Sequence, residues 1–298
     1  MLQQAFPIDY IEPVFRPPSE ARSLILPVTN GCSWNQCTFC EMYTAPQKKF
    51  SVRPEAQVLD ELHRAAQIMD VRRVFLADGD AMALSTRRLM TILAGIKKEI
   101  PNIGRVSSYC LPSNLKNKSV DELKELADAG LTMAYIGCES GDDEVLSMVN
   151  KGETYASSLS ALNKLGAAGI TRSVMILNGL GGSKLSAQHA DQSAKLMSEA
   201  QPEYVSTLVV SFPLGLERFK TRYPDFQPLD QAALLVELER FLSLLELNKT
   251  VFRSDHASNY LVLKGQLGRD KAALLAQVRQ AIAAPQSVPL RQEWQRGL

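Results

Sequence analysis

The stretch LILPVTNGCSWNQCTFCEMY, residues 24–43, places three cysteines immediately after an apolar run with the composition of a β-strand. Cys32, Cys37 and Cys40 lie within nine residues of one another, while the whole chain has five cysteines. A disulfide-stabilised protein would be small and rich in cysteine throughout, so this clustering indicates a metal or redox site in a reducing compartment.

Outward from this loop, short apolar runs alternate with stretches of helical periodicity. The β-like runs are residues 23–28, 73–77, 105–109, 132–137, 173–177 and 204–210. The helical stretches between them are residues 54–69, 86–98, 119–129, 155–168 and 184–199. Ser119 and Glu122 have the spacing of a capping box, and Gly130 and Gly169 stand where helices should end. Regular alternation of this kind is typical of a parallel sheet, open or closed into a barrel.

About six strand–helix units are present, fewer than the eight of a closed barrel. We therefore predict an α/β fold, a partial (β/α)6 TIM-like barrel, over residues 22–214. Residues 1–21 contain several prolines and predict an extended lead-in. Residues 215–298 predict a mainly helical C-terminal extension, with helices at 229–247 and 269–284 and a loop or short strand at 251–263.

Composition narrows the classes of partner. The formal net charge of the 298 residues is +1, so no strong field favours nucleic acid. The longest apolar runs are too short to cross a bilayer, which indicates no membrane partner. Acidic residues and prolines occupy the N-terminus, where a signal peptide needs a basic stretch and then an apolar one. We expect a cytoplasmic protein.

Three thiolates on one loop suit a [4Fe–4S] cluster and leave its fourth iron open to a chelating molecule. Two other interpretations remain open at this point. Cys37 and Cys40 have the spacing of a thioredoxin-like redox pair, which leaves Cys32 without a role. A structural zinc site needs a fourth ligand, and the next candidates are His63, inside a predicted helix, and Cys110.

A strand followed by a three-cysteine loop, with an aromatic residue just before the last cysteine, resembles the radical S-adenosylmethionine (SAM) superfamily. Its commonest spacing is Cys-x3-Cys-x2-Cys, whereas this chain has Cys-x4-Cys-x2-Cys. The resemblance covers about residues 22–212. It implies that Cys32, Cys37 and Cys40 hold the cluster. Trp34 and Phe39, two aromatic residues of the same loop, can shield the cluster from water, and we place Phe39 among the cofactor-binding residues.

The second predicted strand ends in Asp78, Gly79 and Asp80. Radical SAM enzymes usually have a Gly-Gly-Glu-like segment there, so the resemblance implies that these residues receive the amino group of SAM. The structural alternative is a plain turn, because Asp-Gly is a common turn dipeptide.

The fourth predicted strand runs into YIGCESG, residues 135–141. This segment resembles the radical SAM branch that includes oxygen-independent coproporphyrinogen oxidases and tRNA methylthiotransferases. The resemblance implies that Glu139 and Ser140 bind the ribose hydroxyls of SAM. Alternatively, Ser140 and Asp142 cap the following helix, and both roles are compatible.

The fifth predicted strand ends in NGLGG, residues 178–182, and in this branch such a segment approaches the adenine. We therefore place Asn178 and Gly179 among the cofactor-binding residues, although any strand-to-helix loop favours glycine. The catalytic candidates are Tyr109, at the end of the third strand, and the Asp255–His256 pair. A His–Asp pair can move a proton, and the alternative is a local turn cluster.

For the whole protein, the resemblance implies an oxidoreductase-type enzyme with two cofactors, a [4Fe–4S] cluster and S-adenosyl-L-methionine. The reduced cluster would pass an electron to SAM, giving methionine and a 5′-deoxyadenosyl radical that removes hydrogen from a substrate. The implied partners are a small-molecule substrate and a reducing flavodoxin- or ferredoxin-like electron donor. The alternative is a non-catalytic iron–sulfur or zinc protein on the same scaffold.

Overall fold

The computed structural model describes residues 6–296, and the chain divides into two compact units. The first runs up to Asn35 and includes Cys40–Tyr135 and Lys164–Thr171; the second comprises Gln36–Phe39, Ile136–Asn163 and the chain from Arg172 onward. The predicted lead-in over residues 1–21 and the predicted extension over 215–298 each end in residues outside the described range, 1–5 and 297–298.

The first unit is built on parallel strands. These are β1 (Leu24–Pro27), β4 (Arg73–Ala77), β5 (Arg105–Tyr109) and the first part of β6 (Leu131–Glu139), paired in that order. Val74, Phe75 and Leu76 of β4 are fully buried. Continuous apolar runs are what a parallel sheet covered on both faces requires. A small antiparallel pair, β2 (Thr29–Asn30) and β3 (Ser51–Val52), borders the cysteine loop.

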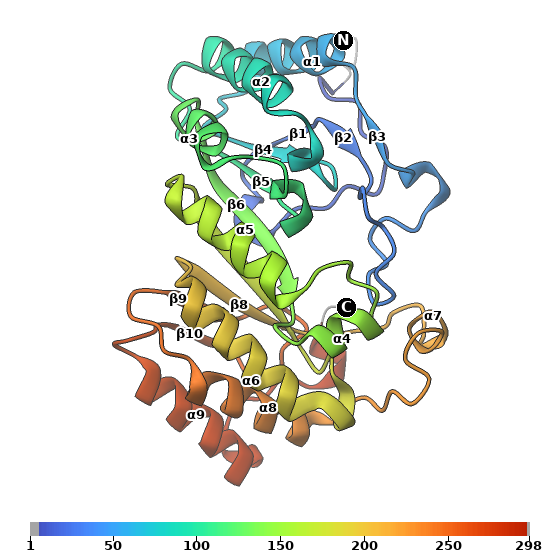
Figure 1. Ribbon diagram of the computed structural model, residues 1–298, viewed down its shortest axis with the longest axis vertical. Coiled ribbons are helices and arrows are strands. Elements are labelled where there is room, and N and C mark those ends of the chain that lie inside the picture. Colours follow the sequence, from blue (N-terminus) through green and yellow to red (C-terminus); the bar gives the residue numbers. More distant parts are fainter. Residues whose placement is uncertain (1–5, 297–298) are drawn as a thin grey trace. The chain divides into compact units, whose positions relative to one another are not determined.

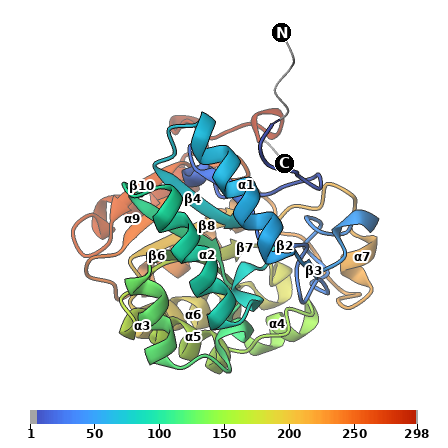
Figure 2. The same cartoon turned by 90° about the horizontal axis from the view of Figure 1, so that it is seen from above.

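Three amphipathic helices cover the strands of this unit and follow one another in Figures 1 and 2: α1 (Glu55–Ile68), α2 (Thr86–Glu99) and α3 (Val120–Asp128). The predicted capping box starts α3, since Ser119 Oγ accepts the Glu122 N–H at 3.1 Å and the Glu122 carboxylate accepts the Ser119 N–H at 2.8 Å. Gly130 follows α3 with φ +115°, the left-handed region that glycine adopts without steric cost. Both sequence signals are confirmed.

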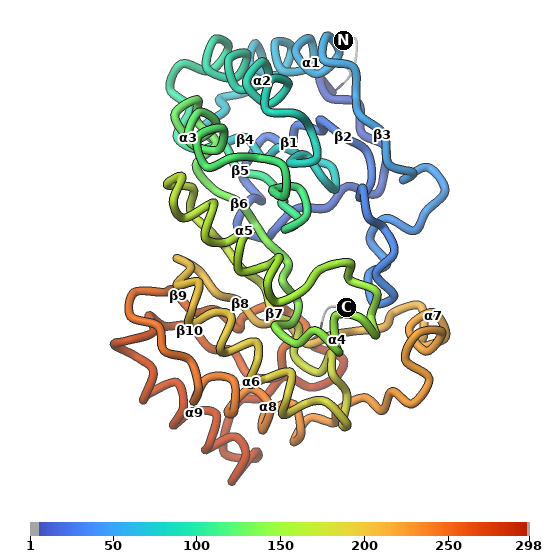
Figure 3. The backbone as a smooth tube through the Cα atoms, viewed as in Figure 1, coloured from blue at the N-terminus to red at the C-terminus, as the bar shows by residue number. Residues whose placement is uncertain are grey.

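The second unit continues the alternation. Its elements are the end of β6, α4 (Asp143–Met148), most of α5 (Tyr155–Ala167) and of β7 (Thr171–Asn178), α6 (Gly182–Ala200), β8 (Tyr204–Val209), α7 (Glu217–Lys220), α8 (Gln231–Leu244), β9 (Val251–Ser254), β10 (Leu263–Gln266) and α9 (Lys271–Ala283). Strand β8 pairs parallel to β7 and to β9, and β10 pairs antiparallel to β9. Helices α6, α8 and α9 lie side by side, as the trace in Figure 3 shows.

The predicted strand–helix alternation is confirmed, because the six predicted strands correspond to β1, β4, β5, β6, β7 and β8. The C-terminal segment holds two strands besides its helices. Strand β9 pairs with β8 because Phe252, which is fully buried, adds an apolar side chain to the core. The domain boundary between residues 214 and 215 stays a prediction.

No helix in the part of the chain that the structure describes is both long and apolar enough to cross a bilayer.

The buried ion pair between Arg53 and Glu61 supplies a first test of the fold. The two Nη atoms of Arg53 donate to the two carboxylate oxygens of Glu61 at 2.8 and 2.7 Å. Glu61→Ala leaves a buried guanidinium without its anion and should lower the free energy of unfolding by about 3–5 kcal/mol. Asp60→Ala removes the exposed Asp60–Arg64 pair of the same helix and should cost below about 1 kcal/mol. Urea unfolding measures both, and equal losses would contradict the prediction.

Candidate active site

The cysteine loop enters through a backbone turn that only glycine can make. Gly31 has φ +73°, and a methyl group on it would overlap the main-chain carbonyl of Lys48. The next residue, Cys32, accepts a hydrogen bond on Sγ from the Asn35 N–H at 3.4 Å. In the first unit, Cys32 and Cys40 are both half-buried. Both residues are therefore partly exposed to solvent.

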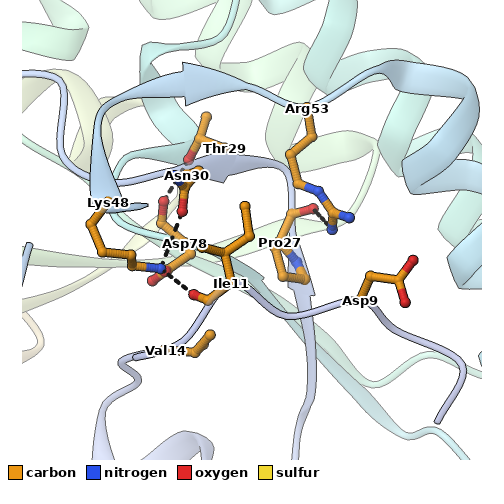
Figure 4. A pocket seen from close by; sticks show the side chains of 9 residues that line it. All are labelled: Asp9, Ile11, Val14, Pro27, Thr29, Asn30, Lys48, Arg53 and Asp78. Atoms are coloured by element: carbon orange, nitrogen blue, oxygen red, sulfur yellow. Dashed lines mark hydrogen bonds and ion pairs between the residues drawn. The ribbon is translucent and has the colours of Figure 1, made fainter. Parts of the chain in front are cut away.

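Lys48 anchors the far end of this loop. Its side chain is buried, and its ammonium donates to the Ile11 carbonyl at 2.6 Å and to Asn30 Oδ1 at 3.2 Å (Figure 4). The same ammonium forms an ion pair with Asp78 Oδ2, and the Tyr43 hydroxyl donates to Asp78 Oδ1 at 2.9 Å. Both carboxylate oxygens of Asp78 thus bind groups of the cysteine loop. The structure gives Asp78 an anchoring role, and its cofactor contact stays a prediction.

The turn after β4 packs directly on the cysteine loop. Gly79 has φ +87°, and a methyl group there would overlap the Gly31 carbonyl and lie 3.0 Å from the Cys32 nitrogen. Any side chain at this position would push the turn away from the first cysteine. Glycine therefore serves a close approach of two backbones here as well as the turn itself.

Asp80 carries an unsatisfied acceptor beside the same loop. Its carboxylate is buried, and Oδ2 accepts hydrogen bonds from the Ser33 hydroxyl and from Asn114 Nδ2, the latter at 3.3 Å. Oδ1 is buried and has no hydrogen-bond partner within residues 6–296. Burial raises the pKa of Asp80, while the bonds from Ser33 and Asn114 oppose that rise. A buried carboxylate oxygen without a partner is costly, so this position suits a ligand that brings a hydrogen-bond donor.

Tyr109 belongs to an aromatic cluster inside the first unit. Its ring packs edge-on against Phe75 and Tyr135, with centroids 5.0 and 6.4 Å apart. Burial raises the pKa of Tyr109, and the charges of Asp78 and Cys40 raise it further. The phenol therefore stays protonated at neutral pH, near the loop that carries Cys40.

Cys37 and Phe39 are held in the second unit by α4 and its surroundings. The Thr38 N–H donates to the Val149 carbonyl at 3.0 Å, just after the end of α4. Phe39 packs against a buried apolar cluster made of Val145, Val149, Leu177, Leu180, Leu185, Phe219, Tyr223 and Phe226. The ring predicted to shield the cofactors thus also belongs to a hydrophobic core.

Glu139 ends β6 in a strained conformation. Its φ is +66°, in the left-handed region that non-glycine residues rarely adopt. A methyl group on Gly137 would overlap Glu139 Oε1, so glycine leaves room for the folded-back carboxylate. Lys151 Nζ lies 3.3 Å from Oε1, and both side chains are buried. Oε2 is buried, and no residue that the structure describes forms a hydrogen bond with it, so a second acceptor is available.

A buried polar network joins Ser140 to the loop that follows β7. Ser140 Oγ lies 2.8 Å from His189 Nδ1, and His189 Nε2 lies 3.9 Å from Glu237 Oε1. Glu237 accepts the Gly179 N–H at 2.6 Å and the Ser186 hydroxyl at 2.6 Å. The network ties two predicted cofactor-binding strand ends together within the second unit.

The ends of β6 and β7 also show conventional local structure. Asp142 caps α4, with Oδ1 accepting the Val145 N–H at 2.9 Å, and Ser140 Oγ accepts the Asp142 N–H at 3.0 Å. Both roles considered for this segment are therefore compatible. Asn178 is buried, and Gly179 has φ +83°.

Asp255 and His256 make separate interactions. Asp255 pairs with Lys264 Nζ at 3.0 Å, whereas His256 Nδ1 lies 2.9 Å from Ser258 Oγ. Burial lowers the pKa of His256, and the nearby Arg291 lowers it further, so the imidazole is neutral at pH 7. This geometry matches the alternative of a local turn cluster, and a proton-transfer role for the pair stays a prediction.

Four residues that hold the candidate site together were not predicted from the sequence: Lys48, Lys151, His189 and Glu237. His189 and Glu237 lie inside α6 and α8, where the helical pattern gives no sign of a buried polar contact. Lys151 follows the YIGCESG segment by ten residues, and its position after a short helix was the only available signal.

Within residues 6–296, no group of three or more cysteine, histidine or carboxylate side chains has the arrangement of a site for a single metal ion.

Residues 26–197, more than half of the chain, match the sequence profile of the Radical SAM superfamily. The matched range contains the three clustered cysteines together with Asp80, Glu139 and Gly179. Asp255 and His256 lie beyond it.

Individual proteins resemble this chain at low sequence identity. Over 164 residues the chain is 27% identical to 4′-phospho-dehydrooxetanocin synthase of Priestia megaterium, a match that covers 50% of this chain and 22% of that enzyme. Coproporphyrinogen III oxidase (HemN) from Escherichia coli, a radical SAM enzyme, has a TM-score of 0.57 at 17% identity, over 74% of this chain and 52% of its own.

The cobalamin-dependent radical SAM enzyme OxsB, solved with SAM bound, has a TM-score of 0.53 at 16% identity, over 92% of this chain and 38% of its own. The chain thus spans about half or less of each of these proteins. At such identities the solved structures report on the fold, and they confirm the predicted α/β fold class of partial-barrel type.

The packing of Gly79 on the cysteine loop predicts the effect of one methyl group. Gly79→Ala should displace the Gly31–Cys32 peptide and reduce the iron and sulfide bound after anaerobic reconstitution at least threefold. Gly130→Ala is the matched control, because Gly130 also has a positive φ, but a Cβ there would have no heavy atom of the described residues within 4 Å beyond its chain neighbours. It should cost about 1 kcal/mol of stability and leave iron binding unchanged. Equal iron content in the two variants would refute the proposed packing constraint.

Proposed function

Because this chain belongs to the radical SAM superfamily, whose enzymes use a [4Fe–4S] cluster and SAM, we propose that it cleaves SAM reductively and abstracts hydrogen from a small-molecule substrate. The observation that carries the proposal is a set of unsatisfied acceptors. Among the described residues, the carboxylate oxygens that are buried without a hydrogen-bond partner are Glu41 Oε2, Asp80 Oδ1 and Glu139 Oε2. Two of these belong to the residues predicted to bind SAM, and the third directly follows Cys40.

Cys32, Cys37 and Cys40 are the proposed cluster ligands. They are half-buried, whereas the two other cysteines, Cys110 and Cys138, are fully buried. Burial raises the pKa of Cys138 to about 12, so this thiol stays protonated and makes a poor ligand. Three ligands leave one iron of a cubane cluster open to a chelating molecule.

Asp80 and Glu139 are the proposed ligands for two different parts of SAM. Asp80 Oδ1 suits the cationic amino group, because a charge-assisted hydrogen bond would satisfy a buried carboxylate that lacks a partner. Glu139 Oε2 suits a ribose hydroxyl, which is a neutral donor, since Lys151 already neutralises that carboxylate. Ser140, Asn178 and Gly179 complete the proposed set, with Gly179 held in place by Glu237.

When bound, the cluster and SAM supply the electron transfer that breaks a carbon–sulfur bond and the hydrogen abstraction that follows. The protein's own residues bind, orient and exclude water. Tyr109 is the favoured substrate-side candidate, because its neutral phenol lies in the same unit as Asp78 and Cys40, whose charges raise its pKa. Asp255 and His256 are retained as candidates beyond the family match. A flavodoxin- or ferredoxin-like protein is the proposed electron donor.

The test of the function is cleavage of SAM by the reconstituted protein. Iron, sulfide, SAM and dithionite are combined without oxygen, and 5′-deoxyadenosine and methionine are quantified. Cys32→Ala, Cys37→Ala and Cys40→Ala should each lower product at least 100-fold together with iron content, whereas Cys110→Ala and Cys138→Ala should retain both. A fully loaded wild-type protein that makes no 5′-deoxyadenosine would overturn the proposal.

Substitutions of the two aspartates that flank Gly79 should change different properties, one the affinity for SAM and the other the iron content. Asp80→Asn removes the charge proposed to bind the amino group and should raise the Kd for SAM about tenfold, with normal iron content. Asp78→Asn weakens the anchor to Lys48 and should lower iron content instead. Equilibrium binding of SAM and iron analysis separate the two. An unchanged Kd in a loaded Asp80→Asn protein would remove Asp80 from the proposed site.

A further inference from the structure

Lys151 is a buried cation that the sequence did not single out. Only 5% of its side chain is exposed, and Nζ lies 3.3 Å from Glu139 Oε1. A Cβ placed on Gly137 would stand 3.6 Å from Nζ, so the ammonium lies against the end of β6. The Lys151 N–H donates to the Leu146 carbonyl at 2.9 Å, which fixes the backbone directly after α4.

The loop around Cys37 runs beside this lysine. The N–H and the hydroxyl of Thr38 both donate to the Val149 carbonyl, at 3.0 and 3.3 Å. Asn150 Nδ2 donates to the Gln36 carbonyl at 3.2 Å. Residues 36–38 are thus bound on both sides of Cys37 to residues 149 and 150, so Cys37 and Lys151 are neighbours within the second unit.

The electrostatics agree with this placement. Burial lowers the pKa of Lys151, but the negative charges of Glu139 and then of the Cys37 thiolate outweigh burial and raise it overall. The side chain is therefore an ammonium throughout the physiological pH range. A buried charge of this kind persists only where its negative partners are fixed in place.

We propose that Lys151 is a positioning residue that holds Cys37 and Glu139 in one charge cluster and raises the reduction potential of the iron–sulfur cluster. The inference rests on the proposed function only in taking Cys37 as a cluster ligand. Three thiolates leave a [4Fe–4S]2+ cluster with a net negative charge, and reduction to the 1+ state adds another. A fixed positive charge beside one thiolate stabilises the reduced state more than the oxidised state.

The proposal also explains why the two carboxylate oxygens of Glu139 have different surroundings. One of its oxygens faces Lys151, while the other is buried and has no hydrogen-bond partner in the described part of the chain. The ammonium thus neutralises a carboxylate that would otherwise repel the negatively charged cluster. It orients that carboxylate so that its second oxygen is presented to a ligand.

The test is a redox titration of the reconstituted cluster without SAM, monitored by the electron paramagnetic resonance signal of the reduced state. Lys151→Met should shift the midpoint potential to a more negative value, and Lys151→Arg should restore it towards wild type. Lys271→Met is the matched control, because the Lys271 ammonium, in the same unit, donates to the carbonyls of Ser243 and Leu245. It should leave the potential unchanged.

A double-mutant cycle separates a direct effect of Lys151 on the cluster potential from an effect that arises because Glu139 loses its partner. Glu139→Gln removes that charge, and the double variant Glu139→Gln with Lys151→Met leaves neither group ionised. If Lys151 acts on the cluster, the double variant has a lower potential than Glu139→Gln alone. Equal potentials for those two proteins, each with normal iron content, would overturn the inference. Absent SAM cleavage by the loaded wild type would instead count against the proposed function.

Discussion

The buried ion pair between Lys48 and Asp78 is the constraint on which the cysteine loop depends. Lys48 closes the loop, Asp78 ends β4, and the hydroxyl of Tyr43 completes the carboxylate's partners. Neither charge is stable alone in a buried position, so the loop and the strand end must stay together. This ion pair fixes the end of β4. Gly79 therefore packs against the Gly31–Cys32 peptide, and the Asp80 carboxylate accepts a hydrogen bond from Ser33 of the same loop.

The features that lower the stability of this protein occur at residues predicted to bind its cofactors. The strained Glu139 and the unsatisfied oxygens of Asp80 and Glu139 each lower stability when nothing is bound. Such features persist because neighbouring groups determine them: Lys151 and Gly137 for Glu139, and Ser33 and Asn114 for Asp80. In the second unit, His189 holds the Ser140 side chain and Glu237 holds the Gly179 backbone in the same way. Asp80, Glu139, Ser140 and Gly179 are thus each held by a hydrogen bond or ion pair to a polar side chain.

The alternation of strands and helices was predictable because its signals are local. Apolar runs, helical periodicity, the capping box at Ser119 and the glycine at 130 all act within a few residues along the chain. The strand ends that carry Asp80, Glu139 and Gly179 followed from the same pattern. Strand β9 was not predicted as a member of the parallel sheet, because its place beside β8 depends on pairing with residues 47 positions earlier in the chain.

From the amino-acid order alone came the α/β fold class, the three clustered cysteines and the acids at two strand ends, since each of these is a matter of residue type and spacing. The roles of those acids depended on long-range packing. Asp78 and Asp80 are alike in sequence, yet burial beside Lys48 makes one an anchor, while the other keeps an unpartnered oxygen. Likewise, only folding brings Lys151 to Cys37, more than a hundred residues earlier in the chain. Charge pairing inside a protein depends on distance in space, and distance along the chain does not reveal it.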